Sequence, residues 1–420
     1  MGRSSTASSD CDAPRTPGAA HCDISRASPL EKRRKNFNER RQPFFSGKSA
    51  ALLPEKSHCP AEGATFMDAI DFKALNSQIP GADKAAEEAS LRRWSLVAKP
   101  LKSLGRLEEM VTRIAAVTGQ ARFRAEKRVL VVLCADNGVI AQGVTQTDDS
   151  ITALVASDLA KDCSSANLMA HVAKCDVLPV DMGIKNPLPA PGILNRRIAA
   201  GTRDFTQGPA MSRTQAIQAL QTGIELAHLC KARGYSVIAT GEMGIGNTTT
   251  ASAVASVLLG CDPREITGRG AGLSTEGLRR KIAAVARAVE LNRPDPDDPL
   301  DVLSKLGGFD IAAMTGLYIG GALERMPVVI DGVISAVSAL AASRLCPACT
   351  FAMLPSHMSS EPAAKRVFGA LGMTPVINAE MRLGEGTGAL CLFPLLDMAL
   401  SLYNGLVFSD IGMEAYTPQV

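Results

Sequence analysis

Short apolar runs alternate with longer amphipathic segments along most of the chain, and this alternation predicts an α/β fold. Runs with the length and composition of buried strands lie at residues 129–135, 176–180, 237–239, 328–330 and 351–354. Segments with helical spacing or small apolar residues lie at 107–117, 150–159, 212–233, 251–259 and 390–400. Because strands that alternate with helices are typical of parallel sheets, we expect a parallel α/β sheet.

The N-terminal part of the chain differs from the rest. Residues 1–66 are rich in Ser, Pro, Ala and charged residues without a periodic apolar pattern, so we predict a disordered basic extension. This extension contains 11 Lys and Arg and 7 Asp and Glu, whereas residues 67–420 contain 34 and 35. The folded part is therefore close to neutral, which argues against a nucleic-acid-binding surface. Two helical stretches are expected within 67–98, separated by Pro80-Gly81.

Composition excludes further classes of protein. Hydrophobic residues make up 46% of the chain and aromatic residues only 4%, so a large aliphatic core is expected without aromatic platforms for nucleic-acid bases. No window of about 20 residues is apolar enough for a membrane span. The 11 cysteines are scattered through apolar contexts, which is typical of buried thiols in a reducing cytoplasm. Cys346 and Cys349 lack a second ligand pair, so we expect no metal site.

Glycine-rich turns follow several predicted strands. Gly241–Thr250 joins the strand at 237–239 to a helix of small residues, and Gly268–Leu273 is a second glycine cluster ahead of another helix. A strand, a glycine-rich turn and a helix together direct backbone N–H groups and the helix dipole toward an anion. Neither turn continues as a dinucleotide-binding fingerprint or a Walker A loop. With the acids at Glu242, Asp310, Asp331 and Glu385, these turns indicate a phosphorylated, sugar-containing ligand.

A single carboxylate, Glu385, lies between Gly384 and Gly386 just before the apolar helix at 390–400. Small neighbours let the backbone bend sharply and let a ligand come close. An isolated acid in this setting suits a general base. The alternative is a carboxylate that only caps the following helix, as acids near helix N-termini do.

From Met67 to Val420, the chain resembles the nicotinate-nucleotide–dimethylbenzimidazole phosphoribosyltransferases of cobalamin lower-ligand assembly. The matching segments occur in the order of that family: Lys102–Glu108, Gly241–Thr249, Gly268–Leu273, Gly307–Ala312, Asp331-Gly332, Ser356-His357 with Ser359 and Glu361, and Arg382–Ala389. The resemblance implies a mostly parallel, Rossmann-like sheet flanked by helices, with a small helical domain. It also implies a homodimer that needs no cofactor.

The resemblance suggests a division of the chain into four segments. After the extension at 1–66 come the N-terminal helices of the small domain at 67–106. The large α/β domain occupies 107–380, and a catalytic loop with C-terminal helices occupies 381–420.

The reaction implied is transfer of the phosphoribosyl group of nicotinate mononucleotide to a benzimidazole-type base, with inversion, giving nicotinate and an α-ribazole phosphate. Glu385 matches the general base that takes the N–H proton of the acceptor, and Glu242 matches a second acid beside the nucleotide. Lys281 alone could be a solvated charge, and Asp331 alone could be a turn former. The residues assigned to the nucleotide and its phosphate are Gly244, Ile245, Gly246, Asn247, Thr248, Gly270, Gly272, Lys281, Asp310, Asp331, Gly332 and Ser359.

The departures from the family lie where the acceptor base is expected. Asp136-Asn137-Gly138 stands where the family usually has Asp-His-Gly, and Val144–Asp149 lacks the usual Ser or Tyr followed by Pro. Another base, such as adenine or a phenol, therefore stays open, as does a homologue that binds without turnover. The residues assigned to the base pocket are Asp136, Asn137, Gly138, Thr145, Asp148 and Leu383.

Overall fold

The computed structural model describes residues 70–416. The predicted disordered extension at 1–66 lies outside these described residues. Within residues 70–416, no helix combines the length and the apolar character needed to span a lipid bilayer.

The centre of the described part is a six-stranded sheet in the order β3-β2-β1-β4-β5-β6, and every neighbouring pair of strands is parallel. The strands are β1 (Arg128–Ala135), β2 (Cys175–Gly183), β3 (Leu194–Asn195), β4 (Val237–Met243), β5 (Val328–Ile330) and β6 (Met353–Pro355). The parallel Rossmann-like sheet expected from the sequence is confirmed. The chain order reverses between β1 and β4, and ligands of open α/β sheets bind beyond the carboxyl ends of strands at such a point.

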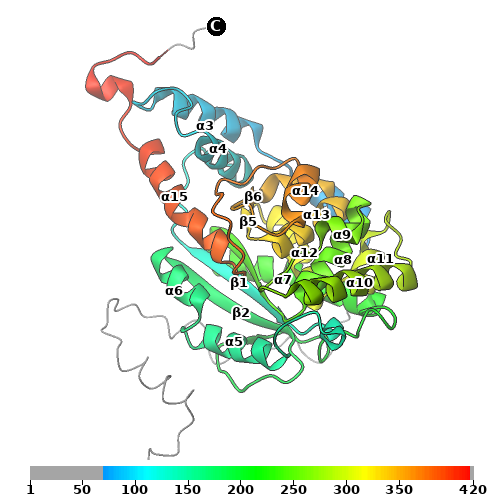
Figure 1. The fold of residues 1–420 in the computed structure, drawn as a ribbon. Helices are drawn as coiled ribbons and strands as arrows, with labels where there is room; N and C mark the ends of the chain where they lie inside the picture. Colours follow the sequence, from blue (N-terminus) through cyan, green and yellow to red (C-terminus); the bar gives the residue numbers. More distant parts are fainter. Residues whose placement is uncertain (1–69, 417–420) are drawn as a thin grey trace, which may run out of the picture. The chain divides into compact units, whose positions relative to one another are not determined.

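Helices cover both faces of this sheet (Figure 1). They are α2 (Phe72–Gln78), α3 (Lys84–Leu96), α4 (Arg106–Thr118), α5 (Ser150–Ala160), α6 (Ser165–Val172), α7 (Arg213–Ala232), α8 (Asn247–Leu259), α9 (Pro263–Ile266), α10 (Thr275–Asn292), α11 (Pro299–Leu306), α12 (Phe309–Leu323), α13 (Val333–Leu345), α14 (Ala363–Leu371) and α15 (Thr387–Tyr403). Short 3₁₀ turns are η2 (Gly138–Gln142), η3 (Pro347–Ala352) and η4 (Phe408–Ile411).

The two faces of β1 pack into two different hydrophobic clusters. Val129 and Val131 pack with residues of α7, α12 and α13, whereas Leu130 and Val132 pack with residues of α4, α6 and α15. All eight residues of β1 are buried. A strand covered on both faces has no polar side to alternate with, which is why 129–135 appears in the sequence as a continuous apolar run.

Several elements differ from the sequence-based expectation. The first half of the expected strand at 351–354 belongs to the 3₁₀ turn η3, and β6 begins only at Met353. The apolar pattern does not predict the two-residue strand β3. The apolar pattern also does not predict α6, α11, α13 or α14. Two of these, α6 and α11, have only 8 residues each, about two turns, which is too short for helical periodicity to stand out.

The N-terminal helices α3 and α4 pack against each other, and α4 also lies against the C-terminal helix α15 (Figure 1). Segments from the two ends of the described chain thus meet beside the sheet. We propose that they form the small helical domain, with segment boundaries near residues 106 and 381.

Candidate active site

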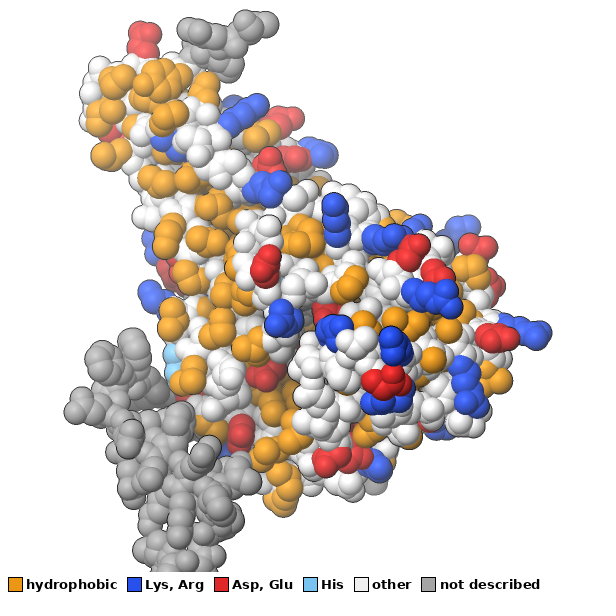
Figure 2. Space-filling model, in the orientation of Figure 1, with side chains coloured by type: hydrophobic (Ala, Val, Ile, Leu, Met, Phe, Trp, Pro, Cys, Tyr) orange, Lys and Arg blue, Asp and Glu red, His pale blue; other side chains and the backbone are white. Residues whose placement is uncertain are grey.

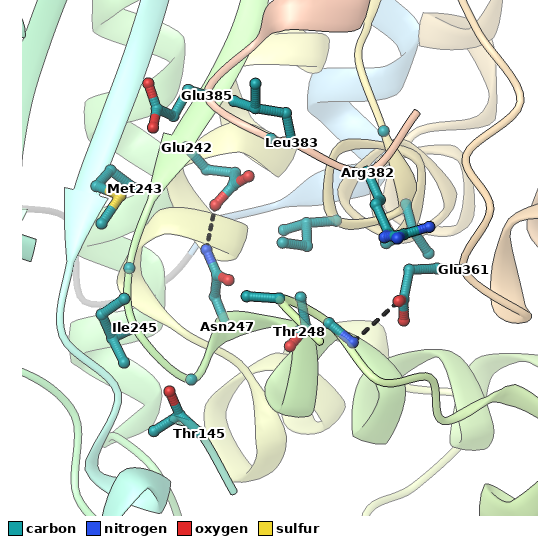
Figure 3. Close-up of a pocket in the computed structure, with 18 of the residues that line it drawn as sticks. Thr145, Glu242, Met243, Ile245, Asn247, Thr248, Glu361, Arg382, Leu383 and Glu385 are labelled. Atoms are coloured by element: carbon teal, nitrogen blue, oxygen red, sulfur yellow. Dashed lines mark hydrogen bonds between the residues drawn. The ribbon is translucent and has the colours of Figure 1, made fainter. Parts of the chain in front are cut away.

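A cleft with a cavity volume of about 360 Å³ lies beyond the carboxyl end of β4 (Figure 3). This volume falls within the usual range for small-ligand sites, roughly 300–1,000 Å³. The turn after β4, the loop before α15, the turns after β5 and β6 and the segment before α5 all line it. Of the residues predicted from the sequence, those that line the cleft are Glu385, Glu242, Gly244, Ile245, Gly246, Asn247, Thr248, Gly270, Asp331, Gly332, Ser359, Thr145 and Leu383.

The turn between β4 and α8 brings backbone amides to the cleft. Gly246 is the N-cap of α8 with φ +96°, and no side chain caps this helix. The N–H groups of Asn247 and Thr249 donate to the carbonyls of Gly244 and Gly246, whereas within residues 70–416 the N–H of Thr248 has no partner and is available to a ligand. Gly244 is required for a different reason: a Cβ atom here would overlap the carbonyl oxygen of Ala135 and lie 3.1 Å from Nδ2 of Asn137. The geometry of this turn fits the anion-binding role expected from the sequence.

A buried pair of carboxyl groups lies at the base of this turn. The side-chain amide of Asn247 bridges them, because its Nδ2 donates to Glu242 and, at 3.1 Å, to Oδ2 of Asp310. Burial raises the pKa of Glu242 well above its usual range, and the nearby charge of Asp310 raises it further. Burial also raises the pKa of Asp310, to about 6. The pair therefore holds protons at a pH where exposed carboxyl groups are already ionised.

The loop that carries Glu385 has an unusual backbone. Gly384, Glu385 and Gly386 have φ values of +86°, +58° and +80°, so three successive residues lie in the left-handed region. Glycine adopts this conformation readily, but a glutamate does so at a cost of about 1–3 kcal/mol. Strain of this kind persists where the surrounding structure holds it, and it is concentrated at functional sites. Burial raises the pKa of Glu385, and the negative charge of Asp331 raises it further.

The carboxylate that bonds to the first turn of α15 is Asp331 rather than Glu385. Oδ1 of Asp331 accepts from the backbone N–H of Ala389 at 2.9 Å, and the N–H of Asp331 donates to Oγ of Ser335, also at 2.9 Å. The N-cap of α15, Gly386, has no side-chain capping bond. Helix capping therefore does not explain Glu385, and Asp331 anchors the start of α15.

Lys281 lies behind the cavity wall and is fully buried. Its Nζ donates to Oγ1 of Thr248 at 2.8 Å. Burial lowers the pKa of Lys281 to about 8, although the charge of Glu361 opposes this shift. Glu361 also accepts from the N–H of Gly270 at 3.0 Å, so it holds the second glycine turn against the cleft.

Some predicted residues do not line the cleft. Asp136, Asn137 and Gly138 follow β1 and lie outside the lining. Asn137 lies against the Gly244–Gly246 turn, because Cβ atoms at Gly244 and Gly246 would come within 3.1 and 3.3 Å of its side chain. Asp148 is exposed and accepts from the N–H of Ser150 at 2.9 Å at the start of α5. The predicted residues outside the lining are Asp136, Asn137, Gly138, Asp148, Gly272, Lys281 and Asp310.

Other lining residues were not assigned a role from the sequence. Ile151, Val155 and Met243 contribute apolar surface to the cleft, and His357 and Arg382 contribute polar groups. The apolar residues look like ordinary core positions in the sequence. Arg382 lies within the stretch that carries the family resemblance, and this position is the signal that could have identified it.

The buried Asp310 gives a prediction about stability and pH. Because its pKa rises from 3.8 to about 6 on folding, the folded state holds a proton over this interval that the unfolded state has lost. Its contribution to stability is therefore complete below pH 3.8 and is lost as the pH rises through about 6. We expect Asp310→Asn to remove this loss, so chemical denaturation should show a smaller fall in unfolding free energy with rising pH.

Asp298 provides a control, because folding lowers its pKa whereas folding raises that of Asp310. Burial raises its pKa, but hydrogen bonds and the charge of Arg213 outweigh this, and the net pKa is lowered. The contribution of Asp298 to stability is lost as the pH falls. Asp298→Asn should therefore flatten the acid side of the profile of unfolding free energy against pH. An Asp310→Asn profile parallel to that of the unaltered chain would contradict the assignment.

Comparisons with known proteins agree with this geometry. A family model described as phosphoribosyltransferase matches residues 79–411. The chain is 44% identical to the nicotinate-nucleotide–dimethylbenzimidazole phosphoribosyltransferase of Ruminiclostridium cellulolyticum, over 84% of this chain and 99% of that protein. It is 41% identical to the enzyme of the same name from Clostridium acetobutylicum, over 83% of this chain and 99% of that protein. The crystal structure of CobT from Thermus thermophilus superposes with a TM-score of 0.75 at 36% identity, covering 79% of this chain and 99% of that chain. The chain therefore belongs to the phosphoribosyltransferase family.

Proposed function

We propose that the chain transfers the phosphoribosyl group of nicotinate mononucleotide to a benzimidazole-type base, giving nicotinate and α-ribazole 5′-phosphate for the nucleotide loop of cobalamin. The observation that carries this proposal is that Glu385 and the uncapped N-terminus of α8 line the same cleft. One supplies a base for proton transfer and the other supplies donors for a phosphate. The names of the relatives support the same reaction.

The donor brings its own leaving group. The ring nitrogen of nicotinate mononucleotide is a pyridinium, so cleavage of its bond to the ribose returns the electron pair to nitrogen and releases a neutral pyridine ring. The acceptor uses one ring nitrogen to form the new bond to the same ribose carbon. As this bond forms, the proton on the other nitrogen must leave, and Glu385 is the proposed acceptor of that proton. Attack opposite the leaving group inverts the anomeric carbon.

The phosphate site can be tested at Lys281. We expect Lys281→Met to raise the KM for nicotinate mononucleotide by about 10- to 100-fold, because it removes a positive charge behind the cavity wall and the hydrogen bond that holds Oγ1 of Thr248 at the cleft. Hydrogen bonds to charged groups contribute about 1.5–3 kcal/mol. Steady-state kinetics measures this change. Lys84→Met is the control, because Lys84 is exposed and, among residues 70–416, forms an ion pair only with Glu87. An unchanged KM in Lys281→Met would remove this residue from the phosphate site.

The acceptor class is tested by a product survey. Ile151, Val155, Met243 and Leu383 give the cleft an apolar surface suited to a flat aromatic base. We expect nicotinate release with dimethylbenzimidazole to exceed release with adenine or a phenol. Release with adenine or a phenol alone would favour the related transferase, and no release with any base would favour a binding protein without turnover.

We also propose a homodimer in the cytoplasm. Exposed apolar side chains gather on the end of α15 and the segment after it, where Leu402, Leu406, Ile411 and Met413 are each at least 46% exposed (Figure 2). Clustered apolar side chains of this kind mark interaction surfaces. We expect the unaltered chain to sediment as a dimer and Leu406→Glu to sediment as a monomer. A monomeric unaltered chain would contradict this proposal. The cytoplasmic location stays a prediction.

A further inference from the structure

The charges that line the cleft do not match an anionic donor at first sight. Four carboxyl groups line it: Glu242, which burial favours in its protonated form, and Asp331, Glu361 and Glu385. Nicotinate mononucleotide carries a phosphate and a ring carboxylate, and the carboxylate would be repelled in this setting unless a cation lay beside it. The phosphate has the α8 N-terminus and the buried Lys281. A second positive group is needed for the ring carboxylate.

Two guanidinium groups are found among the described lining residues, those of Arg269 and Arg382. Arg269 is already engaged, because it donates to the carbonyl of Leu273 at 2.7 Å and to Oγ1 of Thr275 at 3.2 Å. Within residues 70–416, the guanidinium of Arg382 makes no ion pair or hydrogen bond. Arg382 therefore retains its full capacity to bind a carboxylate in a bidentate manner.

The position of Arg382 suits the leaving group. Figure 3 shows its side chain and that of Glu385 leaving the same loop in different directions, with the guanidinium directed toward Glu361. The N–H of Ser360 donates to the carbonyl of Met381 at 3.2 Å, which joins the Arg382 loop to the turn after β6. An inverting displacement needs the acceptor and the leaving group on opposite sides of the ribose carbon, and separate positions for Glu385 and Arg382 meet that need.

We propose that Arg382 binds the ring carboxylate of the donor and so selects nicotinate mononucleotide over nicotinamide mononucleotide. This inference rests on the proposed function. The amide of the competing nucleotide carries no charge to pair with the guanidinium, so it gains less from the same contact. Arg382 is thus a specificity-determining residue for the leaving group, in the same loop as the general base.

The test compares the two nucleotides as donors for dimethylbenzimidazole, using the full chain. We expect Arg382→Gln to lower kcat/KM for nicotinate mononucleotide by about 10- to 100-fold and to leave that for nicotinamide mononucleotide nearly unchanged. Arg382→Lys keeps the charge and should recover part of the selectivity. Arg287→Gln, an exposed substitution on α10, should leave the selectivity unchanged.

Each outcome decides between roles. Equal losses for both nucleotides would place Arg382 at the phosphate and overturn the proposal, and unchanged selectivity would overturn it as well. If the unaltered chain releases no nicotinate, the proposed function fails and the inference fails with it. If the unaltered chain is active and Arg382→Gln keeps its selectivity, only the inference fails.

Discussion

Glu385→Gln is expected to lower the rate of product formation by roughly 10²–10⁴-fold while binding of nicotinate mononucleotide is retained. The amide has nearly the same shape as the carboxylate, but it cannot take the proton of the acceptor base. In the unaltered chain, burial raises the pKa of Glu385, so the rate should rise with pH as this group ionises. The variant should lose this ascending limb. Steady-state kinetics over a range of pH, with calorimetric titration of the nucleotide, measures both effects.

Glu380 provides a matched control for this substitution. It is also a glutamate with positive φ, +53°, but it is exposed and lies outside the cleft lining. Glu380→Gln should therefore retain the activity and its pH profile. Turnover by Glu385→Gln equal to that of the unaltered chain would remove Glu385 as the general base.

Gly244→Ala is the second substitution with a large expected effect. The added Cβ would overlap the carbonyl oxygen of Ala135 in β1, and a backbone atom in a central strand cannot move aside as a flexible side chain can. Overpacking of this kind costs about 1–3 kcal/mol of stability. The turn would also shift, and displacement of the cleft wall by about 1 Å can lower activity by about 100-fold. Thermal unfolding and nicotinate release measure the two effects.

Gly369→Ala is the control for that substitution. Gly369 lies in α14 without a positive φ, and a Cβ there would meet nothing within 4 Å. Alanine favours a helix over glycine by about 1 kcal/mol, so this variant should be as stable as the unaltered chain or more stable. Full activity and stability in Gly244→Ala would show that the turn is less tightly packed than the structure indicates.

The sequence predicts the parallel sheet well because burial leaves a direct mark on it. Strands such as β1 are buried on both faces and appear as continuous apolar runs, and α7 begins with a capping box of Ser212 and Gln215, near the start of the helical segment expected at 212–233. The apolar pattern does not predict helix α13 because its small apolar residues show no polar face. Burial on all sides removes the periodicity by which a helix is recognised.

The candidate site shows a similar limit. The sequence identifies the glycine turn at 241–250 and Glu385 because a charged residue among small neighbours in a tight turn is rarely an ordinary solvated surface charge. The resemblance assigns Asn137 to the base pocket because it stands where the family usually has the His of Asp-His-Gly, but a sequence position does not show whether the side chain faces a cavity or, as here, a neighbouring turn. Exposure alone does not distinguish Arg382 from a solvated charge, whereas its place in the Arg382–Ala389 segment and the arrangement of the cleft do.

The most direct test of phosphoribosyl transfer is a single-turnover reaction with the chain in excess over nicotinate mononucleotide and with dimethylbenzimidazole present. Rapid quenching and mass spectrometry follow nicotinate and the ribosylated product, and NMR assigns the anomer. We expect equal amounts of nicotinate and α-ribazole 5′-phosphate. Formation of ribose 5-phosphate in place of the base adduct, or no release of nicotinate, would contradict the proposed transfer.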